Sequence, residues 1–170
     1  FWNAETERID RRILIWIFAF ALLIRIFLLV SPEVIHNDAT EYIRYARQML
    51  HGDWSTGRSH PFYPLLIALA HFVTPTDEMA GIGVSVIFGA LLVFPIFYLG
   101  KAMFGEKVAL IAAILAAFHP DLYIMSGSVL TESTFHFLFA CAVLFGWNAF
   151  DRGRWRDVFF FSLFTSLAYL

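Results

Sequence analysis

Apolar and polar positions alternate along this chain in long blocks. Four apolar runs approach or exceed the roughly 20 residues that a helix needs to cross a bilayer. They cover residues 13–30, 79–103, 108 to about 124, and about 130–150, and a fifth run begins at Asp157. Pro95 lies inside the second run and predicts a kink there. The pattern indicates an all-α, polytopic transmembrane protein.

Residues 31–78 form a long polar insert between the first two apolar runs. Within it, residues 38–50 fit a short helix that Asn37 or Asp38 can cap, with Tyr42, Tyr45 and Met49 at helical spacing. Residues 61–73 are apolar but too short to span comfortably. We therefore expect short interfacial helices in this loop.

Composition supports a membrane location. Of the 170 residues, 59% are hydrophobic and only 15% are charged, and the mean hydropathy is +0.68. The net charge of −2 says nothing about nucleic acid, but the sequence has no basic, aromatic-interleaved patch, so we expect no nucleic-acid partner. Cys141 is the only cysteine, so no disulfide can form within the chain. The sequence starts at Phe1 and stops inside an apolar run, so we expect a fragment of a longer protein.

Basic residues beside the apolar runs predict the orientation, because they favour the cytoplasmic side. They are Arg8, Arg11 and Arg12 before the first run, Lys101 and Lys107 after the second, and Arg152, Arg154 and Arg156 after the fourth. Residues 31–78 and 119–131 then face the extracytoplasmic side.

Four short motifs lie in order between the apolar runs. They are Asp38-Ala39-x-x-Tyr42 with Gly52-Asp53-Trp54, then His60-Pro61-x-Tyr63-Pro64, then Leu99-Gly100-x-x-Met103-Phe104-Gly105, and last His119-Pro120 with Thr131-Glu132. In this arrangement the chain resembles the amino-terminal part of a polytopic GT-C glycosyltransferase of the protein-mannosyltransferase and aminoarabinose-transferase type, glycosyltransferase family 39. The later spans and the carboxy-terminal part of such an enzyme are missing.

The resemblance implies an inverting transfer of a sugar from a polyprenyl-phosphate carrier to an acceptor hydroxyl on the extracytoplasmic face of a bacterial or archaeal plasma membrane. Asp38 matches the family's catalytic acidic residue and would act as general base. The local sequence alone is explained equally well if Asp38 is the N-cap of the helix. Glu132 would orient the acceptor or Asp38. Alternatively it is only a carboxylate in the first turn of a helix, where the helix dipole favours a negative charge.

Five further residues are predicted to bind substrate, namely Tyr42, Arg58, His60, Tyr63 and Arg25. Arg25 lies within the first apolar run, where it could snorkel to the outer interface or supply a counter-charge to the carrier phosphate or to Glu132.

Outward-facing His36, His60, His119 and Asp121 raise the question of a divalent metal, but they have no fixed ligand spacing. Some relatives carry an acidic-Lys pair, with a metal ligand at the acid, where this chain has Ser59-His60. We assign no metal ligand, and a divalent metal stays open.

The expected partners are the polyprenyl-phosphate sugar donor, membrane lipids, and a glycan, lipid or protein acceptor. Two other functions fit the same architecture. A transporter or flippase for a lipid-linked substrate would place ionisable residues in several spans, whereas here Arg25 is the mid-span exception. A non-catalytic assembly or scaffold subunit with the same fold predicts that Asp38→Asn leaves the activity of the host membrane unchanged.

Overall fold

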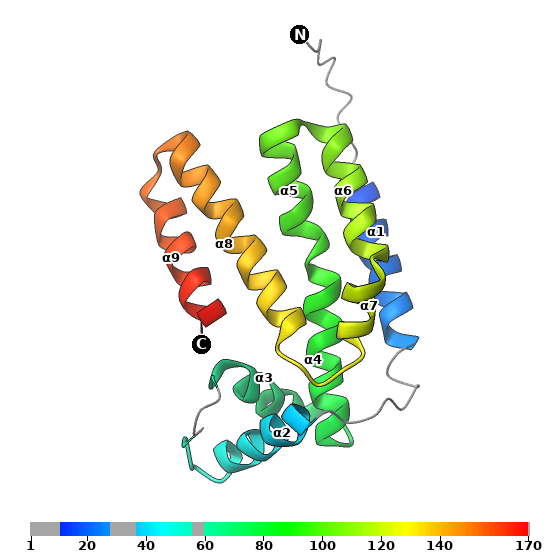
Figure 1. Cartoon of the computed structure of the whole chain (residues 1–170), viewed down its shortest axis with the longest axis vertical. Helices are drawn as coiled ribbons and strands as arrows, with labels where there is room; N and C mark the ends of the chain where they lie inside the picture. Colours follow the sequence, from blue (N-terminus) through cyan, green and yellow to red (C-terminus); the bar gives the residue numbers. More distant parts are fainter. Residues whose placement is uncertain (1–10, 28–36, 56–59, 170) are drawn as a thin grey trace.

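The computed structural model describes residues 11–27, 37–55 and 60–169, and their regular structure is helical (Figure 1). In chain order the elements are α1 (Arg11–Ile26), α2 (Asn37–Leu50), α3 (Phe62–Ala70), the 3-10 turn η2 (His71–Val73), α4 (Asp77–Leu91), α5 (Val93–Phe104), α6 (Glu106–Phe118), α7 (Pro120–Ser126), α8 (Glu132–Arg152) and α9 (Trp155–Tyr169). The expected all-α class is confirmed.

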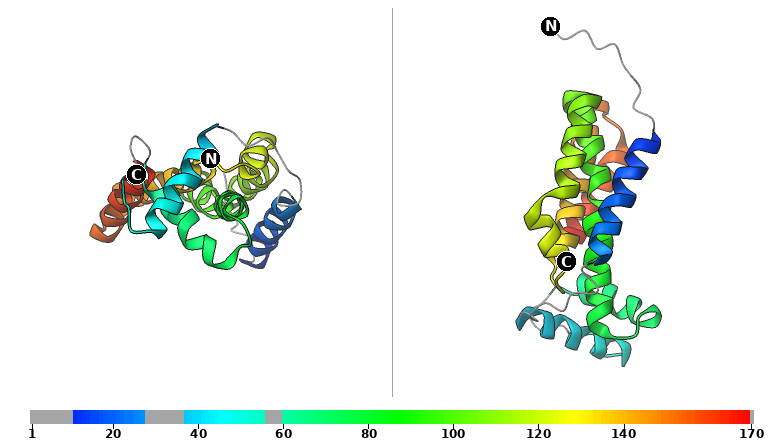
Figure 2. Two further views of the ribbon diagram at one scale, coloured as in Figure 1. Left: turned by 90° about the horizontal axis from the view of Figure 1, so that it is seen from below. Right: turned by 90° about the vertical axis from the view of Figure 1, so that its right-hand side faces the viewer.

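The long helices run side by side, and α2 and α3 lie crosswise at one end of them (Figures 1 and 2). The start of α1, the α5–α6 turn and the α8–α9 turn lie at the opposite end (Figure 1). These segments carry the basic residues that the sequence analysis grouped on one side, such as Arg12, Lys101 and Arg154. The basic residues that flank the long helices are therefore separated from α2 and α3 by the length of the bundle.

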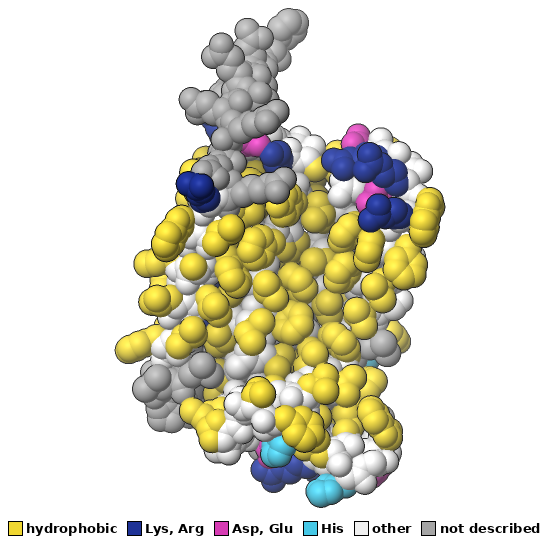
Figure 3. Space-filling view, turned by 180° about the vertical axis from the view of Figure 1, so that it is seen from behind, with side chains coloured by type: hydrophobic (Ala, Val, Ile, Leu, Met, Phe, Trp, Pro, Cys, Tyr) yellow, Lys and Arg dark blue, Asp and Glu magenta, His cyan; other side chains and the backbone are white. Residues whose placement is uncertain are grey.

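A broad band of exposed apolar side chains lies between the two charged ends (Figure 3). Within the described residues, Asp77–Phe104 and Glu132–Arg152 are long and apolar enough to cross a bilayer, and the bent pair α6–α7 makes a third span if it is counted as one. Helix α1 covers most of the predicted run 13–30, whose residues 28–30 lie outside the described part. The chain is a membrane protein.

Pro95 explains an interruption in the second predicted span. Because proline has no N–H and its ring clashes with the carbonyl four residues earlier, it disrupts the turn before it. The break between α4 and α5 falls at Leu92, three residues ahead of Pro95. The two helices nevertheless form one apolar segment, Asp77–Phe104.

The third predicted span is not one straight helix. The sequence analysis expected residues 108 to about 124 to be continuous, but α6 ends at Phe118 and α7 begins at Pro120, bent by 50°. Proline disfavours the helical conformation of the residue before it, and His119 is extended, with φ −61° and ψ 125°. The expectation of an unbroken span is wrong for this local reason.

Helix α2 begins one residue before the predicted helix 38–50 and ends at the same residue. Its small and branched apolar face, Ala39, Ile43 and Ala46, packs into one buried cluster with residues of α3, α4 and the loop before α8. The cluster members from those elements are Tyr63, Ile67, Ala68, Ala80, Val84 and Val129. This packing holds the polar insert against the end of the bundle.

Candidate active site

Tyr42 is the residue around which the predicted site assembles. It lies one helical turn after Asp38 on α2, so both side chains occupy the same face. Its ring meets that of Tyr63 edge to face, with 5.3 Å between centroids. Burial raises the pKa of Tyr42, a hydrogen bond with Thr131 lowers it, and the nearby carboxylates of Asp38 and Glu132 raise it further. The phenol is thus held neutral between two acidic residues.

The charges of Asp38 and Glu132, which belong to different elements, therefore both raise the pKa of the same tyrosine. Each belongs to the first turn of its helix, where the positive end of the helix dipole favours a carboxylate. Asp38 is exposed. Glu132 is partly buried, and its Oε2 has no hydrogen-bond partner among the described residues. An unsatisfied carboxylate oxygen is costly when buried, so this position is suited to receive a donor from a ligand.

Tyr63 is almost completely buried, at 2% exposure, and its hydroxyl is engaged inside the protein. It donates to the Gly81 carbonyl at 3.2 Å and lies 2.9 Å from Ser85 Oγ. Ser85 in turn donates to the Leu130 carbonyl at 3.2 Å. Burial raises the pKa of Tyr63. The chain of hydrogen bonds joins α3 and α4 to the residues just before Glu132, so it sets the position of the start of α8.

A cavity of about 250 Å³ lies between α3, the start of α8 and the end of α9. Its lining includes His60, Tyr63, Thr131, Thr134, Phe135 and Tyr169. The rings of His60 and Tyr169 are 5.6 Å apart. Thr134 Oγ1 is buried and has no hydrogen-bond partner in the described part of the chain. Mostly apolar walls with a few hydroxyls are typical of a site for an organic ligand.

A second, open groove of about 540 Å³ follows α2 and is lined by Arg44, Arg47, His51 and Glu78, among others. It is larger, but its lining contains none of the predicted site residues. The smaller cavity is the better candidate, because two predicted substrate-binding residues, His60 and Tyr63, meet there beside Thr131.

The model of the dolichyl-phosphate-mannose-protein mannosyltransferase family matches residues 58–170, which is most of the chain. The chain belongs to this family. No curated protein sequence and no solved structure gave a match.

Membership in the mannosyltransferase family makes the protein a membrane glycosyltransferase of the GT-C type, with a lipid-linked sugar donor and a glycan or protein acceptor in general terms. The matched residues include His60, Tyr63 and Glu132, whereas Arg25, Asp38 and Tyr42 precede the match. The part of the site on α2 is therefore brought to the family segment by the fold.

Arg25 does not snorkel, and that expectation is wrong. Its side chain is fully buried, at 0% exposure. Nε donates to Ser126 Oγ at 3.2 Å, and Nη1 donates to the carbonyls of Ala21 at 3.2 Å and Ala117 at 2.9 Å. Because α6 is broken after Phe118, the carbonyls of its last turn lack helical partners, and Arg25 satisfies one of them. Its predicted contact with the carrier phosphate remains a prediction.

Several predictions fall outside the described residues or stay open. Arg58 and His36 lie in segments that the structure does not describe. His119 Nδ1 is 3.9 Å from Asp121 Oδ2. Within the described ranges, no three histidine, cysteine or acidic side chains gather as a metal site would need. A divalent metal in this mannosyltransferase-family protein therefore stays an open question.

Sequence reasoning assigned no role to Ser85, Ser126 or Thr134. The first two are fully buried hydroxyls within helix bundles, where serine commonly forms hydrogen bonds between helices. A signal was present, because Ser85 lies midway between Gly81 and Gly89 at four-residue spacing on α4. Such a small-residue stripe indicates a close helix contact, but it does not identify the partner.

Proposed function

We propose that the protein transfers a sugar from a polyprenyl-phosphate carrier to an acceptor hydroxyl, with inversion at the anomeric carbon, on the extracytoplasmic face of a bacterial or archaeal plasma membrane. The observation that carries this proposal is that Tyr42, whose pKa the charges of Asp38 and Glu132 both raise, packs edge to face on Tyr63 in the wall of the cavity that contains His60. It supports the proposal because the family already makes the chain a membrane glycosyltransferase.

Asp38 is the general base in this reaction. Its carboxylate takes the proton from the acceptor hydroxyl as the acceptor oxygen bonds to the anomeric carbon. The bond between that carbon and the phosphate oxygen breaks, and the polyprenyl phosphate leaves with the electron pair. An exposed carboxylate suits this role better than a buried one, because the acceptor must reach it.

Glu132 and the cavity orient the reactants. The free Oε2 of Glu132 accepts a hydrogen bond from the acceptor, and the charges of both carboxylates help to keep the Tyr42 phenol neutral. Developing charge on the leaving phosphate calls for nearby donors or cations. His60 and the hydroxyl of Thr131 line the cavity and are the described groups placed to provide them. Its apolar walls accommodate part of the lipid-linked donor.

The orientation proposal rests on charge. The start of α1, the α5–α6 turn and the α8–α9 turn, which carry the basic residues beside the spans, lie at the end of the bundle opposite α2 and α3 (Figure 1). Since lysine and arginine beside spans favour the cytoplasmic side, the site belongs to the extracytoplasmic side.

The test is transfer of labelled sugar from polyprenyl-phosphate donors in membranes that contain the full-length protein. Asp38→Asn is expected to lower the rate about a hundredfold or more, because a general base contributes that much. Asp53→Asn is the matched control, since Asp53 is an exposed acid of the same insert that accepts a hydrogen bond from the Ser55 amide. Glu132→Gln is expected to raise KM for the acceptor.

Transfer at the wild-type rate by Asp38→Asn would remove Asp38 from catalysis. If the wild type transferred no sugar from any donor tried, a transporter or scaffold role would replace the proposed reaction. The same assay with a chelator decides the metal question, since a metal-dependent enzyme would lose activity and regain it when the metal is restored.

A further inference from the structure

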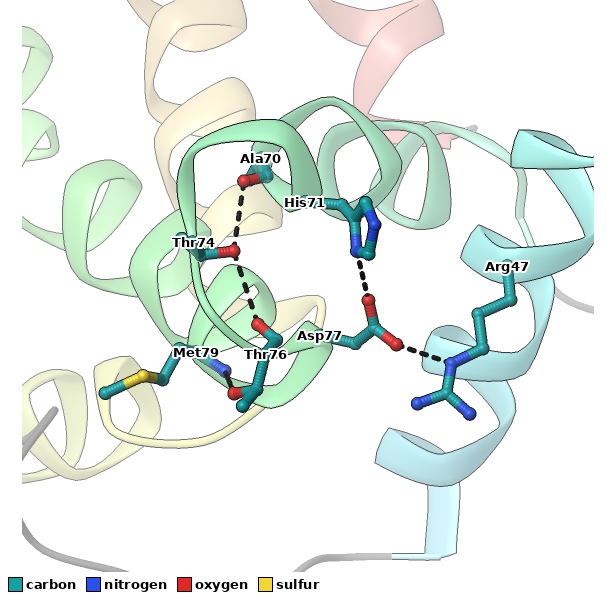
Figure 4. Close-up of polar contacts among 7 residues, drawn as sticks. All are labelled: Arg47, Ala70, His71, Thr74, Thr76, Asp77 and Met79. Atoms are coloured by element: carbon teal, nitrogen blue, oxygen red, sulfur yellow. Dashed lines mark hydrogen bonds and ion pairs between the residues drawn. The ribbon is translucent and has the colours of Figure 1, made fainter.

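Asp77, the first residue of α4, joins three elements through its two carboxylate oxygens (Figure 4). Oδ2 accepts a hydrogen bond from Arg47 Nε on α2 at 2.5 Å, and Oδ1 lies 2.6 Å from His71 Nδ1 in η2. An ionised carboxylate can only accept, so Nδ1 of His71 carries the hydrogen. We call these three residues the Arg47–Asp77–His71 clasp.

The Asp77 side of the clasp is rigidly placed. Asp77 is buried, at 9% exposure, and Thr76 caps α4 by accepting a hydrogen bond from the Met79 amide. The Thr74 hydroxyl donates to the Ala70 carbonyl and closes the turn between η2 and α4 (Figure 4). The carboxylate is thus fixed to the bundle, and Arg47 is the group that reaches it from the crosswise helix α2.

Helix α2 needs a directional contact at this end. Its packing on the bundle is made by Ala39, Ile43 and Ala46, and apolar contacts between such side chains do not fix the position of a helix along its axis. Tyr42, through Thr131, fixes the half of α2 that carries Asp38. Arg47 lies nine residues after Asp38, about 13 Å along the helix at 1.5 Å per residue, and fixes the other half.

We propose that Asp77 is a positioning residue for sugar transfer: through Arg47, and with His71 holding its other oxygen, it keeps α2, which carries Asp38 and Tyr42, in place against the bundle that carries Glu132. This inference rests on the proposed function. Arg47 is 65% exposed, and ion pairs with an exposed partner contribute little to stability. The clasp therefore acts on geometry, where a displacement of about 1 Å can cost a hundredfold in rate.

The variants are Arg47→Gln, Asp77→Asn and the double variant, in the full-length protein. Asp77→Asn removes the negative charge that faces Arg47. The new amide oxygen can still accept from Arg47 and the amide nitrogen can donate to His71 in its other tautomer, so what this variant removes is the ion pair. Arg44→Gln is the matched control. It removes the same charge from the same helix, and Arg44 contacts Glu41 and Tyr45 instead of Asp77.

Two readouts are needed. Hydrogen exchange of the α2 amides measures how firmly the helix is held without reference to activity. Steady-state transfer separates kcat from KM. We expect Arg47→Gln and Asp77→Asn to speed exchange along α2 and to lower kcat about tenfold or more, with a melting temperature within about 3 °C of wild type. The double variant should be no slower than the worse single variant, and Arg44→Gln should match wild type.

The outcomes separate this inference from the function on which it rests. Unchanged exchange in α2, or faster exchange with unchanged kcat, would overturn the positioning role while loss of transfer in Asp38→Asn still supported the proposed reaction. A kcat that falls only in proportion to the amount of folded protein would also overturn it. Absence of transfer by the wild type would overturn both proposals.

Discussion

Gly89 on α4 lies where a side chain cannot fit. A Cβ built at this position would be 2.1 Å from Ser126 Oγ and 3.3 Å from Arg25 Nε. Ser126 Oγ is fully buried, donates to the Leu122 carbonyl at 2.7 Å and accepts from Arg25. The substitution Gly89→Ala therefore tests whether the Arg25–Ser126 contact closes the bundle as the structure indicates.

The magnitude follows from three contributions. Alanine is favoured over glycine inside a helix by about 1 kcal/mol. Against this, an added methyl in a tightly packed interior costs about 1–3 kcal/mol. Moving Ser126 away leaves Arg25 Nε buried without an acceptor, which costs a further 1–3 kcal/mol or so. We expect Gly89→Ala to lower the free energy of unfolding by about 3 kcal/mol.

The assay is reversible chemical unfolding of the full-length protein in detergent micelles. Gly83→Ala is the matched control, because it lies on the same helix and a Cβ there would meet nothing within 4 Å. The control should be as stable as wild type or more stable by up to about 1 kcal/mol. If Gly89→Ala were as stable as Gly83→Ala, the close approach of α4 to Ser126 and Arg25 would be refuted.

Three other substitutions test separate contacts by the same unfolding assay. Arg25→Lys keeps the charge but loses the planar group that reaches Ser126 and two carbonyls, so it should destabilise the protein by about 2 kcal/mol. Stability equal to wild type would argue against these buried contacts. Tyr63→Phe should cost about 1 kcal/mol at neutral pH. Burial raises the pKa of Tyr63, so its neutral phenol contributes stability that is fully present below the ordinary tyrosine pKa of about 10 and is lost as pH rises toward the higher folded value. Wild type should therefore lose stability above about pH 10 more steeply than Tyr63→Phe does. Parallel slopes for the two proteins would contradict this. Thr76→Ala should cost about 1 kcal/mol by removing the cap of α4, and a change near zero would show that the Met79 contact is unimportant.

Much of the local structure could be predicted from the sequence. The apolar runs, the helix at 38–50 and the short helix after Pro61 depend on periodicity and on neighbouring residues, and the structure has helices in all these places. The break at His119 also has a local cause, in Pro120, but the length of the apolar run outweighed it in the prediction. Such features depend on steric rules between neighbouring residues, so they can be predicted from the sequence alone.

The arrangement of the site is different. The shared effect of Asp38 and Glu132 on the pKa of Tyr42 depends on how α2 packs across the bundle, and the family resemblance only suggested that Glu132 supports Asp38. The direction of Arg25 depends on which face of α1 meets the broken α6–α7 segment. The pairing of Asp77 with Arg47 joins residues that are thirty positions apart.

The sequence by itself determined that this chain is a helical membrane protein, where most of its helices lie, and which acidic and aromatic residues belong to its polar insert. Only the tertiary structure decided which of these residues meet. The physical reason is range: helix formation and burial in a bilayer depend on neighbours within a few turns, whereas hydrogen bonds such as that of Arg25 with Ser126 form only after distant helices have packed.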